Sequence, residues 1–180
     1  LAVTAMATTM TASSAAALSW IFYDAWKGRK PSAMGTCIAA VVGLVAITPA
    51  AGFVSIPHSL IIGVVAALVS NILVDWRSRT GLDDTLDVFP CHGVGGMVGM
   101  LLTGVFAHTA VNGANTTGNG LLFGETHLFI VQSLALVGVS VFAFLGSMAL
   151  LKLTDIISPL RVSASDELEG LDLSQHGEKL

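Results

Sequence analysis

Long uncharged stretches alternate with short polar segments along this chain. Residues 1–23 and 31–74 contain no Asp, Glu, Lys or Arg, and a third uncharged stretch covers residues 88–124. A helix needs about 20 apolar residues to cross a hydrocarbon layer about 30 Å thick. The pattern therefore predicts an all-α polytopic membrane protein.

Turn-forming residues divide these stretches into shorter segments. Pro49, Gly52 and Pro57 interrupt the second stretch, and a segment rich in Gly, Asn and Thr follows Ala107. Such residues mark turns and loops rather than continuing helices. We therefore expect five transmembrane helices, which cover residues 1–23, 33–50, 57–75, 88–107 and 126–151.

The end of the chain has a different composition. Residues 154–180 carry six acidic and two basic residues, a charge of −4 that equals the formal net charge of the whole chain. Pro159 separates this segment from the last predicted span. We expect a transmembrane domain over residues 1–153 and a water-exposed C-terminal tail over residues 154–180.

The basic residues predict the orientation in the membrane. All of them follow the first, third or fifth predicted span, and these flanks lie on one side of the membrane. Lys and Arg are enriched in cytoplasmic loops. The N-terminus is therefore expected outside and the tail in the cytoplasm. The residues concerned are Lys27, Arg29, Lys30, Arg77, Arg79, Lys152, Arg161 and Lys179.

Composition excludes several other classes of protein. Of the 180 residues, 53% are hydrophobic and only 11% are charged, whereas about a quarter are charged in a soluble domain. The negative net charge argues against a nucleic-acid partner. Cys37 and Cys91 lie in apolar stretches, so no disulfide framework is expected. We find no nucleophile–base pair, cofactor motif or metal-ligand cluster, and we expect neither an enzyme nor a bound cofactor.

Two polar residues mark the start of the fourth predicted span. Asp87 stands where the helix begins, so we expect its carboxylate to cap free backbone N–H groups, with Pro90 in the first turn. His92 lies inside the span, where ionisable residues are rare and face a bundle interior or a pore. A neutral imidazole can both donate and accept a hydrogen bond. From the residues alone, His92 is either a core histidine or a contact for a small polar solute.

Several segments resemble the ammonium transporter family, which comprises the Amt and Mep proteins and, more distantly, the Rh proteins. The segment DDTLDVFPCHGVGGMVGMLLTGVFA (83–107) is similar to the signature helix of that family. Further similar segments are ALSWIF (17–22), GLVAITPAAGFV (43–54) and LRVSASDELEGLDLSQHGE (160–178). The resemblance covers essentially the whole chain, with the motifs in the family's order.

The resemblance implies a homotrimer in which each protomer has eleven helices and its own hydrophobic pore. The eleven helices form two inverted five-helix halves, and this chain resembles helices seven to eleven. An odd number of predicted spans that begins abruptly at Leu1, without a signal peptide, indicates a chain that starts in the middle of a protein.

The resemblance also implies roles for individual residues. His92 matches the second of two paired pore histidines, and Val88 and Thr48 match pore-lining positions. The partner histidine, the outer ammonium recruitment site and a phenylalanine gate belong to the family's first half. Pro90 stands where many relatives have glycine. The tail residues that match a regulatory motif are Glu169, Gly170, Asp172, His176 and Gly177, and the resemblance implies a PII-type signalling protein as a possible partner of the cytoplasmic face.

The implied function is transport of ammonium across the cell membrane. In the family, ammonium loses a proton at the outer vestibule and ammonia passes the two imidazoles. Three alternatives stay open at this point: an Rh-like channel for another small neutral solute, an ammonium sensor whose tail signals, and a fragment that does not transport.

Overall fold

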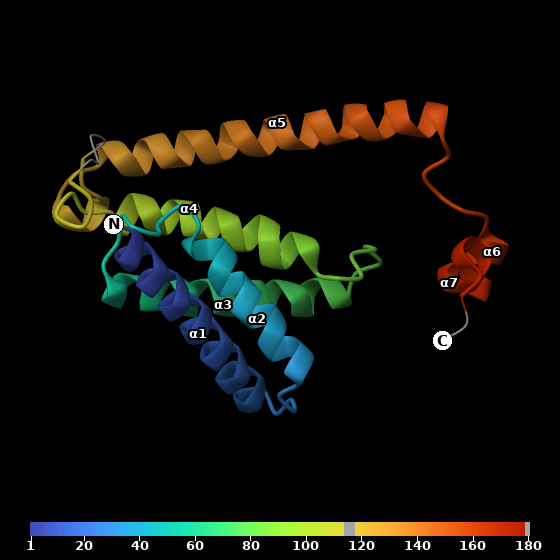
Figure 1. Ribbon diagram of the computed structural model, residues 1–180, viewed down its shortest axis with the longest axis horizontal. Helices are drawn as coiled ribbons and strands as arrows, with labels where there is room; N and C mark the ends of the chain where they lie inside the picture. The colour runs from blue at the N-terminus through green and yellow to red at the C-terminus, as the bar shows by residue number, and fades with distance from the viewer. Residues whose placement is uncertain (114–117, 179–180) are drawn as a thin grey trace. The chain divides into compact units, whose positions relative to one another are not determined.

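The computed structural model describes residues 1–113 and 118–178, and it is helical with no strand among these residues. Its longer helices are α1 (Ala2–Trp26), α2 (Ala33–Ile47), α3 (Ile56–Ser78), α4 (Gly95–Phe106) and α5 (His127–Ile157). Packing divides the chain into two compact units, residues 1–136 and 137–180. The first unit contains α1 to α4 and the beginning of α5 (Figure 1).

Three helices of the first unit meet at Ala12. α1 packs against both α2 and α3 (Figure 1). A side-chain carbon on Gly43 of α2 or on Gly63 of α3 would collide with the backbone of Ala12. Small residues let helix backbones approach closely in a membrane, where lipid supplies no hydrophobic drive between helices. Gly43 and Gly63 therefore let α2 and α3 approach the backbone of α1 closely.

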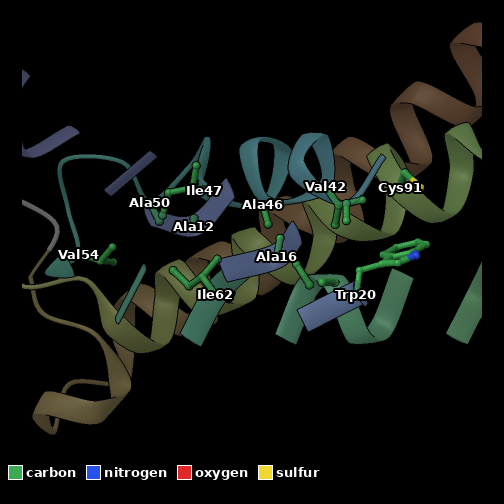
Figure 2. Packing of buried hydrophobic residues seen from close by; sticks show 13 residues of the cluster. Ala12, Ala16, Trp20, Val42, Ala46, Ile47, Ala50, Val54, Ile62 and Cys91 are labelled. Carbon is green, nitrogen blue, oxygen red and sulfur yellow. The ribbon is translucent and has the colours of Figure 1, made fainter. Parts of the chain in front are cut away.

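α4 packs on α2 in the same manner. Gly95 faces Val42, and Gly99, one turn later, lies against the backbone of Ala46. Because both contacts advance along the two helices together, α2 and α4 run in the same direction. The buried cluster of the first unit is made mostly of alanine, with Trp20 of α1 as its largest side chain, and partly buried side chains of α4 pack against it (Figure 2).

The helices agree with the predicted spans to within a few residues at most ends. α2 stops at Ile47 rather than at residue 50, because turns through Pro49 replace the helix. By length and composition, three helical segments of the described residues are long and apolar enough to cross a membrane: Ile56–Ser78, Phe89–Phe106 and His127–Ile157. α2 is apolar but has only 15 residues, so the number of spans remains a prediction.

The second unit begins within α5 and includes two short helices, α6 (Ala164–Glu169) and α7 (Leu171–His176). α5 continues past the predicted end at residue 151, because Lys152 and Asp155 do not break a helix; it ends just before Ser158 and Pro159. The expected boundary between membrane domain and tail at residue 153 rests on composition alone, and it stays a prediction.

Candidate functional site at the start of α4

A π-helical turn, Phe89–Val94, leads into α4. Its first backbone groups are capped by Asp84, whose two carboxylate oxygens accept the N–H groups of Val88 at 2.8 Å and Phe89 at 2.9 Å. These hydrogen bonds favour the ionised carboxylate, and the Phe89 N–H is the largest cause of the lowered pKa of Asp84. Asp84 therefore performs the capping role at this helix.

The prediction that Asp87 caps the helix is wrong. Its backbone has a φ of +53°, in the left-handed region, and its side chain turns to α3 instead. There it forms an ion pair with Arg77, whose Nε lies 3.0 Å from a carboxylate oxygen and whose Nη2 also contacts that oxygen. Asp87 thus ties the loop before α4 to the end of α3.

A second contact from α3 reaches the π-helical turn itself. The Ser70 hydroxyl donates to the Pro90 carbonyl over 2.9 Å, and both residues are buried. Ser70 and Arg77 are seven residues apart, about two helical turns, so they lie on the same face of α3. This face of α3 holds the segment from Asp87 to Pro90.

His92 is exposed, whereas the two residues before it, Pro90 and Cys91, are buried. Val88 lies four residues before His92 and is 51% exposed. The spacing places both side chains on one face of the helical segment. The structure therefore brings His92 together with Val88, one of the two other residues that the sequence assigned to the pore.

Thr48 lies elsewhere, at the C-terminal end of α2. Its side chain is exposed, and its hydroxyl donates to the Leu44 carbonyl over 2.9 Å. Gly95 of α4, three residues after His92, faces Val42 of α2, and Thr48 lies six residues beyond Val42. Because α2 and α4 run in the same direction, Thr48 lies about 13 Å farther along the bundle than His92, at a rise of about 1.5 Å per residue. The side chains of Thr48 and His92 therefore do not contact each other.

The ends of α1 and α3 near this site are joined by a polar network that sequence analysis missed. The guanidinium of Arg29 pairs with Asp24 at 2.5 Å and with Asp75, and it donates to Asn71 at 2.6 Å. The hydrogen bond to Asp75 is the largest cause of the raised pKa of Arg29. The network places the basic loop after α1 beside the basic end of α3, as the predicted topology requires.

The same network lines an open groove of about 270 Å³, which Asp87 also borders. No sequence pattern indicates this groove, because its polar lining comes from segments that are distant in the sequence: Arg29 and Asn71 are 42 residues apart. Among the described residues there is no group of three or more His, Cys, Asp or Glu side chains that could hold a metal ion.

At the other end of the bundle, two histidines pack in an aromatic cluster. The His58 ring stacks on Phe106 with centroids 4.9 Å apart, and Phe123 contacts both His58 and His108 edge-on. The loop beside them is closed by Glu125, which accepts the backbone N–H of Asn119 at 2.9 Å; this bond is the largest cause of the lowered pKa of Glu125.

The tail residues singled out by the sequence lie in the second unit. Gly170 has a φ of +102° and separates α6 from α7, and Gly177 has a φ of +68° at the end of α7. A left-handed backbone favours glycine, because other side chains are strained there. The remaining three residues lie at the end of α6 or within α7: Glu169, Asp172 and His176.

Together, these features define a helical membrane protein whose fourth apolar segment exposes a histidine. The model of the Ammonium Transporter Family matches residues 1–180. The chain belongs to this family.

Named relatives agree with this assignment. Over 98% of its length the chain is 39% identical to Ammonium transporter Amt1 of Archaeoglobus fulgidus, and over 95% it is 40% identical to an ammonium transporter of Bacillus subtilis. It covers 44% and 42% of these two proteins. The crystal structure of Candida albicans Mep2 superposes with a TM-score of 0.82 at 33% identity, over 91% of this chain and 37% of that one. The chain thus spans less than half the length of these relatives.

Proposed function

We propose that this chain is part of an ammonium transporter and that His92 lines the path of the substrate. One observation carries the proposal: in a chain of this family, an apolar helical segment presents an imidazole on an exposed face. An ionisable side chain inside a span is costly unless it faces the bundle interior or a pore. The part of a full-length protein that covers this face would then complete the pore.

Physical chemistry favours a path for neutral ammonia. Moving a cation from water into an apolar pore costs far more than moving a neutral molecule. Ammonium that sheds its proton at the outer side avoids this cost. His92 can donate to ammonia or accept from it through its imidazole edge, while Val88 keeps the path apolar next to it. Thr48 lines the same path at a separate level, farther along it.

The surroundings of the chain form part of the same proposal. α1 to α5 cross a cell membrane five times, with the basic loops and the tail in the cytoplasm. Most of the surface of α5 consists of exposed apolar side chains. These side chains contact lipid and further copies of the protein in a homotrimer. A PII-type protein binds the cytoplasmic face of the protein, which includes the tail motif from Glu169 to Gly177.

The function is tested by flux through the full-length protein, reconstituted into liposomes after its assembly has been checked. We expect uptake of ammonium and methylammonium without uptake of potassium. Ammonium binding without flux would favour a sensor, and flux of another neutral solute alone would favour an Rh-like channel. Neither binding nor flux in an assembled protein would contradict the proposal.

A further inference from the structure

We propose that Ser70 is a positioning residue for His92, acting through the carbonyl of Pro90. This inference rests on the proposed role of His92 in the substrate path. It starts from the only described contact in which a buried hydroxyl of α3 reaches the π-helical turn: the Ser70 hydroxyl lies 2.9 Å from the Pro90 oxygen, two residues before His92.

The contact differs from most hydroxyl contacts in the described helices. Ser59 on α3 is also buried, but its hydroxyl donates within its own helix, to the Ile56 carbonyl. Thr103 on α4 likewise donates within its own helix, to Gly99. Such local bonds do not fix one helix relative to another. The Ser70 bond joins two helical segments and therefore fixes the position of the turn against α3.

The turn has a geometry that needs such support. A π-helical turn is rare and persists mostly as a single turn within α-helices, often at functional sites. Pro90 has no N–H of its own, so it cannot donate to the preceding turn. At the end of the turn, the Gly95 N–H donates to the His92 carbonyl. The Ser70 hydroxyl supplies a partner to the Pro90 carbonyl inside an otherwise apolar region.

The geometry of the turn decides which side chain is exposed. Successive residues of an α-helix differ in direction by about 100°, so a change of register by one residue moves each side chain to a neighbouring face. The structure buries Pro90 and Cys91 and exposes His92. If the turn relaxed toward α-helical geometry, His92 would rotate away from its present face. Ser70 opposes this relaxation from the adjacent helix.

The test compares Ser70→Ala with Ser59→Ala in the full-length protein. Both variants remove one buried hydroxyl from α3, but only the first removes the contact with Pro90. The readout is the imidazole ¹⁵N NMR signal of His92, assigned by its loss in His92→Ala. We expect this signal to shift in Ser70→Ala and to stay in place in Ser59→Ala.

A flux measurement accompanies the spectra. We expect Ser70→Ala to lower ammonium flux about twofold to tenfold relative to Ser59→Ala, as one lost hydrogen bond predicts, with equal assembly of both variants. An unchanged His92 signal in Ser70→Ala, or an equal shift in both variants, would overturn the inference. Because the NMR signal does not depend on transport, a protein without flux would contradict the proposed function and leave this test of Ser70 intact.

Discussion

Arg77 near the end of α3 pairs with Asp87 in the loop before α4, with Nε 3.0 Å from the carboxylate. Both side chains are largely buried, with 21% and 14% exposed. Asp87 also holds a left-handed backbone, which Gly, Asn and Asp adopt more readily than most other residues. The ion pair therefore holds Asp87, with its left-handed backbone, against α3.

This relationship predicts how two substitutions of Asp87 differ. Asp87→Asn keeps a side chain suited to the left-handed backbone but loses the ion pair, and we expect it to destabilise the protein by about 1–3 kcal/mol. Asp87→Ala loses both and should destabilise it more. The melting temperature in detergent measures both effects. Asp83→Ala, at an exposed position nearby, serves as the control, and equal melting of all three variants would contradict the role of the pair.

The cap formed by Asp84 predicts a pH dependence. Its pKa is lowered in the folded protein, so its contribution to stability is present above the pKa of the unfolded chain and is lost as the pH falls through the folded value. We expect wild type to lose more stability than Asp84→Asn below about pH 4. Melting temperatures between pH 3 and pH 7 check this. Parallel curves for the two proteins would show that the cap does not contribute.

The surroundings of each glycine predict whether its substitution by alanine destabilises the protein. An added carbon at Gly63 or Gly99 meets the backbone of a neighbouring helix, whereas Gly146 on α5 has nothing within 4 Å. Gly63→Ala and Gly99→Ala should destabilise the protein by at least about 1–3 kcal/mol, the usual cost of overpacking. Gly146→Ala should be neutral or stabilising, because alanine favours a helix. Melting temperature and yield separate the two groups, and similar values would refute the close helix contacts.

The contacts of Arg29 predict that substitutions of two basic residues in one loop, Arg29 and Lys30, differ in their effect on stability. Lysine cannot replace the planar guanidinium that contacts Asp24, Asn71 and Asp75 together. Since the Arg29 side chain is 36% exposed, we expect Arg29→Lys to destabilise the protein by only about 1 kcal/mol, or about 2–4 °C in melting temperature. Lys30→Gln, at an exposed neighbour, should have no such effect. A loss as large for Lys30→Gln would mean that the network does not stabilise the helix ends.

The sequence predicted the helical class and most helix ends, because uncharged stretches and turn residues are local signals. It also singled out His92 as a candidate pore residue, because an ionisable side chain inside an apolar segment is unusual by itself. The contacts of α3 could not be predicted in this way. Ser70, Asn71 and Arg77 resemble ordinary helix residues, and their partners become visible only when segments distant in the sequence meet.

The exchange of roles between Asp84 and Asp87 has a similar cause. Both carboxylates precede the helix, and the spacing favoured Asp87 as the cap. The left-handed backbone at Asp87 and the nearby Arg77 direct that side chain to α3, and Asp84 then reaches the free N–H groups. A π-helical turn likewise leaves no pattern in the order of apolar residues.

The role of His92 is tested most directly by ammonium and potassium flux through His92→Ala in reconstituted full-length protein. His127→Ala, which removes an exposed histidine at the start of α5, is the matched control. We expect His92→Ala to assemble normally and to lose ammonium flux or its selectivity over potassium, while His127→Ala keeps both. Wild-type flux and selectivity in a well-assembled His92→Ala protein would contradict the assignment of His92 to the substrate path.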